Sequence, residues 1–274
     1  MLSGAQITLA ITLFAKANDF RSRRSILKDW KADEIVRSLN LDFEQIKAKG
    51  ARTLLVVRAR TIDDWTRDCL ARFPSAVVLN LGCGLDSRIL RISPAPGVGW
   101  YDVDFPEVIA LRRRFFTIGP GYEMREGSIS DPSWLAGIPR DRPVVALLEG
   151  VLEYLPSEEV QRIFRSLTQS FERGVVIFDI MNSAAAQAAN SRLKGASGVS
   201  LQWTVDDLAV IDAIDPRLRR VEAYRYASSK LLPFTQRLLF RLASTSSKMQ
   251  DFVRLVRCEF GTDPTPTALR ADPR

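Results

Sequence analysis

Short apolar runs alternate with helical stretches from residue 76 onward, and this alternation limits the folds open to the chain more than any other feature. The apolar runs lie at 76–81, 99–105, 144–149 and 174–180, with a weaker candidate at 122–129, and the helical stretches at 107–116 and 157–171. Strands and helices that alternate at this pace predict a parallel sheet covered on both faces. Runs such as VVALL and VVIF lack polar alternation, as expected of fully buried strands. We therefore expect an α/β fold with a doubly wound, mostly parallel sheet.

The segments on either side of this alternation extend the fold. DWKADEIVRSL and RARTIDDWTRDCLARF place apolar residues at helical spacing, which predicts a helical segment over residues 1–75. RRVEAYRY and FVRLVRCEF alternate apolar and polar residues near the C-terminus, as half-buried antiparallel strands do, and the helix-forming LLPFTQRLLFRLAS separates them. We expect a sheet domain over 76–261 that ends in an antiparallel strand, followed by a flexible tail over 262–274.

The charge distribution argues against a nucleic-acid partner. The net charge is +7, and residues 1–75 hold most of the excess, with 14 basic and 9 acidic side chains. Both signs are interleaved between Asp19 and Glu34, as on a solvated helix face, and no platform of aromatic and basic residues follows. The apolar run from Ile7 to Ala15 is too short to span a bilayer and has no basic segment before it. We expect a cytoplasmic enzyme without nucleic-acid or membrane partners.

The chain contains no histidine and three scattered cysteines. This composition excludes a Ser-His-Asp triad, a Cys-His pair and the common histidine zinc sites. No CxxC pair is present. We expect no metal site.

A glycine-rich loop follows the first apolar run, in VVLNLGCGLDSRILRI at 77–92. Gly82 and Gly84 would let the backbone pass close to a ligand beyond the carboxyl end of a strand. A dinucleotide fingerprint requires a third glycine where this chain has Ser87, for packing around the pyrophosphate. The loop therefore indicates either a ligand other than a dinucleotide or a structural strand-to-helix turn.

The second apolar run ends in two acidic residues, Asp102 and Asp104, which lie 20 and 22 residues beyond Gly82. An acidic residue at the end of the second strand is where a ribose diol is bound in nucleotide-binding folds. Because the two aspartates are two residues apart, they share one face of the strand. Either carboxylate alone would also be compatible with a solvated loop.

Three motifs together resemble a known family. NLGCGLDSR, WYDVDFPEVI and LLEGVLEYLP are similar to the motifs of S-adenosylmethionine-dependent enzymes of the leucine carboxyl methyltransferase type, in particular the polyketide O-methyltransferase branch of the tetracenomycin-synthesis kind. The likeness runs from about residue 8 to residue 261. It implies S-adenosylmethionine as cofactor and S-adenosylhomocysteine as product. This cofactor has no pyrophosphate, which accounts for the missing third glycine.

The resemblance also implies roles for individual residues. Arg60 would pair with the cofactor carboxylate, unless it is a surface arginine. The other implied cofactor contacts are the loop residues Gly82, Cys83, Gly84 and Asp86, the ribose anchor Asp104 with Asp102 as a second candidate, Ser128 and Ile129 beside the adenine, and Glu149 and Gly150 at the end of the fourth strand. Other members have Asp-Leu where this chain has Ser128 and Ile129. Glu149 and Tyr154 are the candidate catalytic residues, although Tyr154 could equally pack and Glu149 could merely favour a helix N-terminus.

The expected chemistry is methyl transfer to oxygen by in-line displacement. A carboxylate acceptor is already ionised at neutral pH, whereas a phenol or enol needs a base. A chain without histidine therefore favours an anionic small-molecule acceptor and no dedicated base. Residues 1–75, the helix near 230–245 and an insertion at 182–204 would form the acceptor pocket, the insertion as a mobile lid or as an ordinary helix with a linker.

The favoured function is an S-adenosylmethionine-dependent O-methyltransferase that modifies a carboxylate or acidic hydroxyl of a polyketide or other natural product. One alternative is an NAD(P)-dependent oxidoreductase, which Ser87 and the lack of a histidine or Tyr-x-x-x-Lys pair argue against. A second is a protein that binds S-adenosylmethionine without turnover.

Overall fold

A computed structural model describes residues 4–39, 52–193, 200–225, 229–243 and 252–261. Its strands are β1 (Val77–Leu81), β2 (Gly99–Asp104), β3 (Tyr122–Glu126), β4 (Val144–Leu148), β5 (Gly174–Met181), β6 (Arg219–Tyr224) and β7 (Val253–Phe260). The α-helices are α1 (Gly4–Phe20), α2 (Trp30–Leu39), α3 (Arg52–Arg72), α4 (Arg88–Ile92), α5 (Pro106–Arg112), α6 (Ser157–Ser170), α7 (Ser183–Leu193), α8 (Ala209–Asp212) and α9 (Phe234–Ala243). Two short 3₁₀ helices are η2 (Pro132–Leu135) and η3 (Leu152–Tyr154).

The strands form one sheet in the order β3-β2-β1-β4-β5-β7-β6. Neighbouring strands from β3 to β5 pair in parallel, whereas β7 pairs antiparallel with both β5 and β6. The predicted doubly wound sheet with an antiparallel C-terminal strand is therefore confirmed. In the sheet, β2 lies on one side of β1 and β4 lies on its other side. The carboxyl ends of β1 and β4 therefore lie at the switch in strand order. Ligands of open α/β sheets bind in the crevice at this point.

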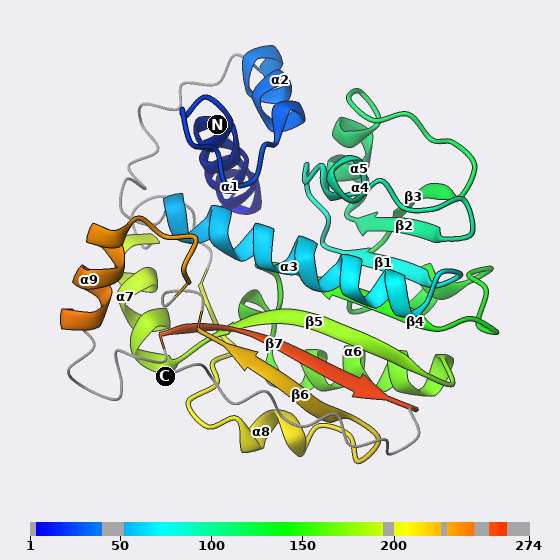
Figure 1. The fold of residues 1–274 in the computed structure, drawn as a ribbon. Helices are drawn as coiled ribbons and strands as arrows, with labels where there is room; N and C mark the ends of the chain where they lie inside the picture. Colours follow the sequence, from blue (N-terminus) through cyan, green and yellow to red (C-terminus); the bar gives the residue numbers. More distant parts are fainter. Residues whose placement is uncertain (1–3, 40–51, 194–199, 226–228, 244–251, 262–274) are drawn as a thin grey trace.

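The helices α1 to α5 lie over one face of the sheet (Figure 1). Leu13 of α1, Ile35 of α2 and Ile62 of α3 are buried in one core cluster with sheet residues such as Val78 and Ile177. The N-terminal helices predicted from the apolar spacing are thus part of the main core. This packing places α1 and α3 near the carboxyl ends of the central strands.

The opposite face is covered by α6, α8 and the 3₁₀ helices. The apolar residues of α6 include Val160, Ile163, Phe164 and Leu167, which recur at three- and four-residue intervals and so face one side of the helix. They pack with strand residues such as Phe178, which Phe164 meets edge to face. Because side chains of consecutive strand residues point to opposite faces, these two clusters account for the uninterrupted apolar strands.

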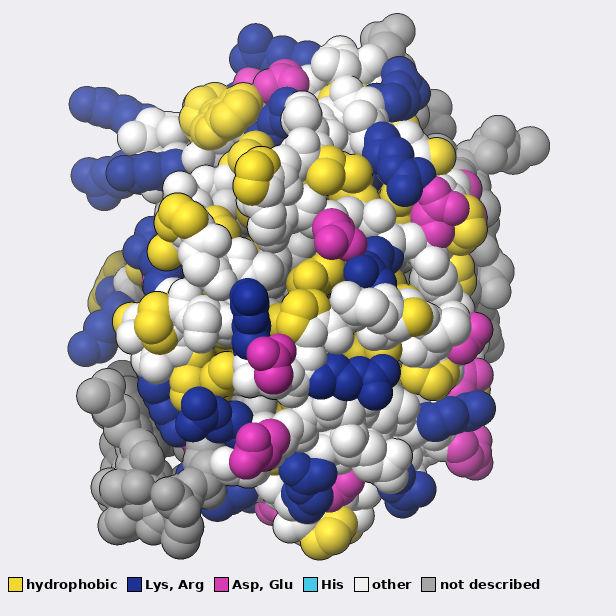
Figure 2. Space-filling model, turned by 90° about the vertical axis from the view of Figure 1, so that its right-hand side faces the viewer, with side chains coloured by type: hydrophobic (Ala, Val, Ile, Leu, Met, Phe, Trp, Pro, Cys, Tyr) yellow, Lys and Arg dark blue, Asp and Glu magenta, His cyan; other side chains and the backbone are white. Residues whose placement is uncertain are grey.

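Some expected segments fall at the limits of the described chain. The tail 262–274 lies outside the described residues, as does 194–199 within the insertion 182–204. The first part of that insertion is α7. No helix of the described ranges has the length and apolarity needed to cross a membrane. On the face shown in Figure 2, basic, acidic and apolar side chains are interspersed.

Candidate active site

A cavity of about 460 Å³ lies at the carboxyl ends of the central strands. Its floor is formed by the loops after β1, β2, β3 and β4, and α1, α3 and α7 supply further walls. The cavity therefore occupies the switch point of the sheet and is bounded by the N-terminal helices and by the insertion after β5. Among the residues predicted for the site, those that line it are Gly82, Cys83, Gly84, Asp86, Asp104, Ser128, Ile129, Glu149, Gly150 and Tyr154.

The loop after β1 brings bare backbone to this cavity. Gly82 and Gly84 have φ values of +67° and +51°, which side-chain-bearing residues rarely adopt. A Cβ atom at Gly82 would lie 2.5 Å from a methyl group of Val151. The loop is also tied to the next strand, because the Gly82 N–H donates to the Val103 carbonyl oxygen over 2.8 Å. Both glycines are thus required by the backbone path, and Gly82 is required also by the close approach of the loop after β4.

Asp104, the last residue of β2, holds its carboxylate at the cavity wall. Its Oδ2 accepts from the Gly84 N–H at 2.7 Å, and its Oδ1 accepts from the Phe105 N–H at 2.8 Å. Burial raises the pKa of Asp104, and these two N–H groups partly oppose the rise because they favour the ionised form. Each carboxylate oxygen has a further lone pair, so the group can still accept from two ligand hydroxyls.

Asp102 is not at the cavity, which corrects its prediction as a cofactor contact. Its carboxylate is fully buried and accepts from the guanidinium of Arg112, with Nη2 at 2.5 Å. The other donors are Tyr122 Oη at 2.6 Å, Asn80 Nδ2 at 2.7 Å and Trp100 Nε1 at 3.0 Å. Asp102 lies two residues before the end of β2, where α5 covers the sheet. Its role is to neutralise a buried arginine.

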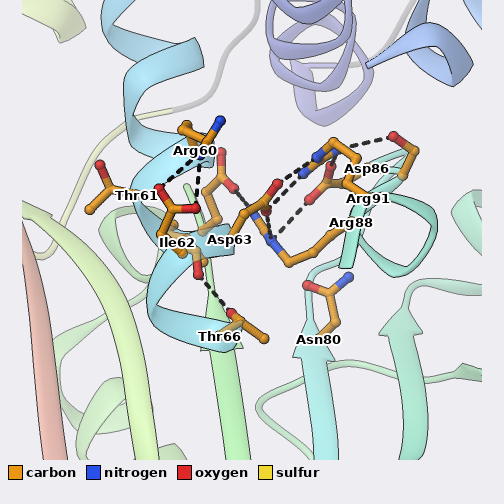
Figure 3. A network of polar contacts seen from close by, with 12 residues as sticks. Arg60, Thr61, Ile62, Asp63, Thr66, Asn80, Asp86, Arg88 and Arg91 are labelled. Atoms are coloured by element: carbon orange, nitrogen blue, oxygen red, sulfur yellow. Dashed lines mark hydrogen bonds and ion pairs between the residues drawn. The ribbon is translucent and has the colours of Figure 1, made fainter. Parts of the chain in front are cut away.

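A network of buried charges lies beside the glycine loop (Figure 3). Asp86 accepts from Lys16 of α1 at 2.9 Å and from Arg91 at 2.8 Å, and it forms an ion pair with Arg88. Arg88 and Arg91 in turn each donate to Asp63 of α3 at 2.7 Å. Burial would raise the pKa of Asp86, but the adjacent cations hold it well below its usual range. The network joins the N-terminal helices to the loop after β1 through charge-assisted hydrogen bonds.

Arg58 on α3 lies at the cavity, whereas Arg60 does not, which corrects the sequence prediction. The Arg58 Nε lies 3.1 Å from Glu149 Oε1, and its Nη1 lies 2.8 Å from Asp179 Oδ2. Arg60 Nε instead donates to Asp64 at 2.9 Å, and 38% of its side chain is exposed. Residues two apart on a helix are rotated by about 200°, so they face nearly opposite sides. In Figure 3 the dashed lines from Arg60 end on α3 itself, and none joins Arg60 to Arg88.

Glu149, after β4, contacts three cations. It lies 3.9 Å from Lys16 Nζ, and it is bonded to Arg58 and to the Nη2 of Arg88. Burial would raise the pKa of Glu149, but these cations lower it to about 2. A carboxylate of such low proton affinity is a poor general base near neutral pH. The structure therefore favours an electrostatic role for Glu149 over the acid–base role considered from the sequence.

Part of the cavity wall is apolar. Leu155, Met181 and Leu201 contribute apolar side chains, and Tyr154 and the buried Glu153 also line the cavity. The carbonyl oxygen of Tyr154 accepts from Gln202 Nε2 at 2.9 Å, which ties this wall to the segment after α7. The cavity is thus lined by apolar residues and by the linked ion pairs of Lys16, Arg58, Asp86 and Glu149, which we call its charged end.

The charged end fits the cofactor that the sequence motifs imply. The amino-acid part of S-adenosylmethionine carries one carboxylate and one ammonium group, and Lys16 and Arg58 lie there beside Asp86 and Glu149. Asp104 has spare acceptor capacity for a ribose diol. Phe105, with 47% of its surface exposed, and Ile129 offer apolar surface for an adenine. The positive φ of the loop glycines supplies the close backbone approach that such a ligand needs.

Sequence comparisons give matches to methyltransferases. The profile of the leucine carboxyl methyltransferase family matches residues 11–119. The chain is 35% identical over 233 residues to the tetracenomycin polyketide synthesis O-methyltransferase TcmP of Streptomyces glaucescens, covering 84% of this chain and 86% of that protein. It is 32% identical to the S-adenosyl-L-methionine-dependent methyltransferase dpfgK of Gibberella zeae, with 80% and 81% covered.

Solved structures share the fold at low sequence identity. A protein of Thermobifida fusca assigned to the methyltransferases aligns with a TM-score of 0.61 and 15% identity, over 90% of this chain and 94% of that one. The plantazolicin methyltransferase BamL, solved in complex with a triazolic desmethylPZN analog and SAH, aligns with a TM-score of 0.52 and 10% identity, over 92% and 99%. These similarities show a methyltransferase fold.

Sequence reasoning missed several cavity residues. Lys16 is a single lysine in an apolar helix, and no spacing rule links it to a loop 70 residues away. Arg58 stands in the same VRAR segment as Arg60, and only the helical phase of α3 relative to the sheet distinguishes them. Arg88 ends the NLGCGLDSR motif, so that motif carried a usable signal. Glu153 lies within LLEGVLEYLP, but the sequence pattern does not indicate that its side chain is buried.

Proposed function

The chain belongs to the leucine carboxyl methyltransferase family, in the polyketide O-methyltransferase branch, and from this premise we propose that it methylates an already anionic oxygen of a small natural-product acceptor. S-adenosylmethionine, when bound, supplies the methyl group and leaves as S-adenosylhomocysteine. The acceptor we propose carries a carboxylate or an acidic hydroxyl on a mainly apolar body. It would lie in the cavity beside Tyr154 and Leu201.

We assign the cofactor contacts to residues at the charged end. Lys16 and Arg58 would hold the cofactor carboxylate, because they are buried cations at the cavity wall. Asp86 and Glu149 would accept from its ammonium group, and Asp104 from the ribose hydroxyls. Both carboxylates with lowered pKa remain charged throughout the physiological range, so this set stays complementary to a zwitterion.

The ionic environment of Glu149 is the observation that best supports an anionic acceptor. Glu149, which the family resemblance implies as a cofactor contact, has a pKa of about 2 and cannot accept a proton from a hydroxyl near neutral pH. The chain has no histidine to take that role, and the buried Glu153, whose pKa is raised to about 8, is mainly protonated at neutral pH. An acceptor oxygen that is ionised in solution needs no base, so alignment and exclusion of water suffice for transfer.

The proposal predicts a defined reaction product. The protein is incubated with S-adenosylmethionine that carries a deuterated methyl group and with a panel of aromatic carboxylic acids, acidic phenols and neutral phenols. Mass spectrometry should detect the mass of one deuterated methyl group on acidic members of the panel, with S-adenosylhomocysteine formed in equal amount. Methylation confined to neutral phenols or to nitrogen would contradict the proposal. Binding of S-adenosylmethionine without any transfer would indicate a protein that has lost turnover.

A further inference from the structure

Glu153, in η3, is a buried carboxyl group on the cavity wall that the proposed function does not use. Only 5% of its surface is exposed, and it lines the cavity. Within the described part of the chain its Oε2 has no hydrogen-bond partner. Its backbone is fixed, because the Glu153 carbonyl oxygen accepts from Gln202 N at 2.7 Å and from Trp203 N at 3.2 Å. A buried polar atom without a partner is costly, and at a cavity wall a ligand can supply the missing partner.

The charges around Glu153 favour its protonated form. Burial is the main cause of a pKa raised to about 8, and the neighbouring carboxylate of Asp179 on β5 adds to it, as does Glu149 after β4. Arg58 of α3 and the backbone N–H of Glu153 itself act in the opposite sense. The guanidinium of Arg58, however, already donates to both Glu149 and Asp179. Lys16 of α1 lies against Glu149 and Asp86.

We propose that Glu153, as a neutral carboxylic acid, donates a hydrogen bond to an oxygen atom of the methyl acceptor and thereby selects acceptors that carry a carboxylate. This inference rests on the proposed function and deepens it, since it names the group that recognises the acceptor. The oxygen bound by Glu153 is the one that is not methylated. A carboxylate offers two equivalent oxygens, so one can accept from Glu153 while the other takes the methyl group.

Donation suits this residue better than proton abstraction. A neutral carboxyl group has a proton to give and no capacity to take a second one at neutral pH. Its ionised form would repel a carboxylate acceptor, and this repulsion is strong where burial lowers the effective dielectric constant. The neighbouring walls, Leu155, Met181 and Leu201, are apolar. Together they fit an apolar ring system that ends in a carboxylate.

The test uses 1-hydroxy-2-naphthoate, a bicyclic aromatic carboxylate, as the probe, and the protein saturated with S-adenosylhomocysteine. Calorimetric titrations are made at about pH 6.5 and about pH 9.5, where the probe carboxylate is ionised throughout. Glu153→Gln keeps a neutral donor at both pH values, and Glu153→Met has similar length without a donor. Wild type should lose about ten-fold in affinity between the two pH values, the scale of one hydrogen bond to a charged group. Glu153→Gln should bind almost equally at both, and Glu153→Met weakly at both.

Several outcomes would overturn the inference. They are probe binding by wild type that is constant or stronger at high pH, a Glu153→Gln variant that binds no better than Glu153→Met, and absence of probe binding by wild type. S-adenosylhomocysteine is titrated first into all three proteins, and thermal unfolding verifies that each is folded. Equal affinity for S-adenosylhomocysteine with no Glu153 effect on the probe would refute only this inference. Failure of wild type to bind S-adenosylhomocysteine would refute the proposed function.

Discussion

The ammonium group of Lys16 lies 2.9 Å from the carboxylate of Asp86, and the two residues are 70 positions apart in the sequence. This buried ion pair joins α1 to the loop after β1 and places a cation at the charged end of the cavity. The N-terminal helix is therefore a wall of the candidate cofactor site as well as a part of the core.

Replacement of Lys16 should weaken cofactor binding. We expect Lys16→Met to reduce the affinity for S-adenosylhomocysteine by about ten- to a hundred-fold, because a charge-assisted hydrogen bond contributes about 1.5–3 kcal/mol. Isothermal titration calorimetry measures this change. Lys230→Met removes an exposed lysine and serves as the matched control. Equal affinities of the two variants would remove Lys16 from the site.

Arg58 and Arg60 provide a matched pair on one helix. Arg58→Lys keeps the charge but loses the fork that spans Glu149 and Asp179, so we expect at least ten-fold weaker binding of S-adenosylhomocysteine. Arg60→Lys alters a half-exposed pair with Asp64, and such surface pairs contribute about 0–1 kcal/mol. Its affinity should stay within about two-fold of wild type. The opposite ranking in titrations of folded variants would restore the assignment made from the sequence.

Replacement of Asp104 should weaken cofactor binding, whereas replacement of Asp102 should destabilise the fold. Asp104→Ala is expected to cost about 1.5–3 kcal/mol of cofactor binding with the fold retained, because its carboxylate lines the cavity. Asp102→Ala should instead destabilise the protein by about 3–5 kcal/mol, since it leaves the buried Arg112 without its counter-ion. Urea unfolding and calorimetry on both variants separate the two effects. A folded Asp104→Ala protein with unchanged affinity would exclude the ribose role.

The pKa of Glu153 predicts a pH dependence of stability. Its pKa is about 8 in the folded protein, above the ordinary value of 4.5, so the folded state binds more protons between these values. The contribution of this group to stability is complete below about pH 4.5 and is lost as the pH rises through about 8. The free energy of unfolding of Glu153→Gln relative to wild type should therefore increase between about pH 5 and about pH 8, and then level off. Urea unfolding of the two proteins without ligand measures it. A constant difference would show that the Glu153 carboxyl is ionised in the folded protein.

The sheet was predictable because its strands are short apolar runs in a regular alternation with helices, a pattern that burial on both faces imposes. The side chains at the site were less so. Asp102 and Asp104 point to the same face of β2, but only Asp104 lies at the strand end, where the Gly84 N–H donates to its carboxylate. Arg58 and Arg60 differ only by helical phase. Such distinctions depend on the depth and rotation of an element against its neighbours, which tertiary packing determines.

Salt dependence follows from an anionic acceptor. The excess of basic residues over residues 1–75 should help attract an anion, and added salt screens such attraction beyond a distance of about 8–10 Å. We expect the apparent KM for the acceptor to rise with salt. The KM for S-adenosylmethionine, whose amino-acid part is zwitterionic, should change less. Initial rates at low and high ionic strength measure both values. An acceptor KM that does not respond to salt would argue against electrostatic attraction.

Methyl transfer to an already anionic oxygen is tested most directly by the single-turnover rate as a function of pH. Wild-type protein is saturated with S-adenosylmethionine and with the acceptor identified by the deuterated-methyl screen, and the rate of transfer is measured from about pH 5.5 to about pH 9. We predict a nearly constant rate at saturation, because a carboxylate is ionised across this range and no base takes part. A rate that rises with pH along a titration limb would contradict the account and would instead indicate a hydroxyl acceptor deprotonated by the enzyme.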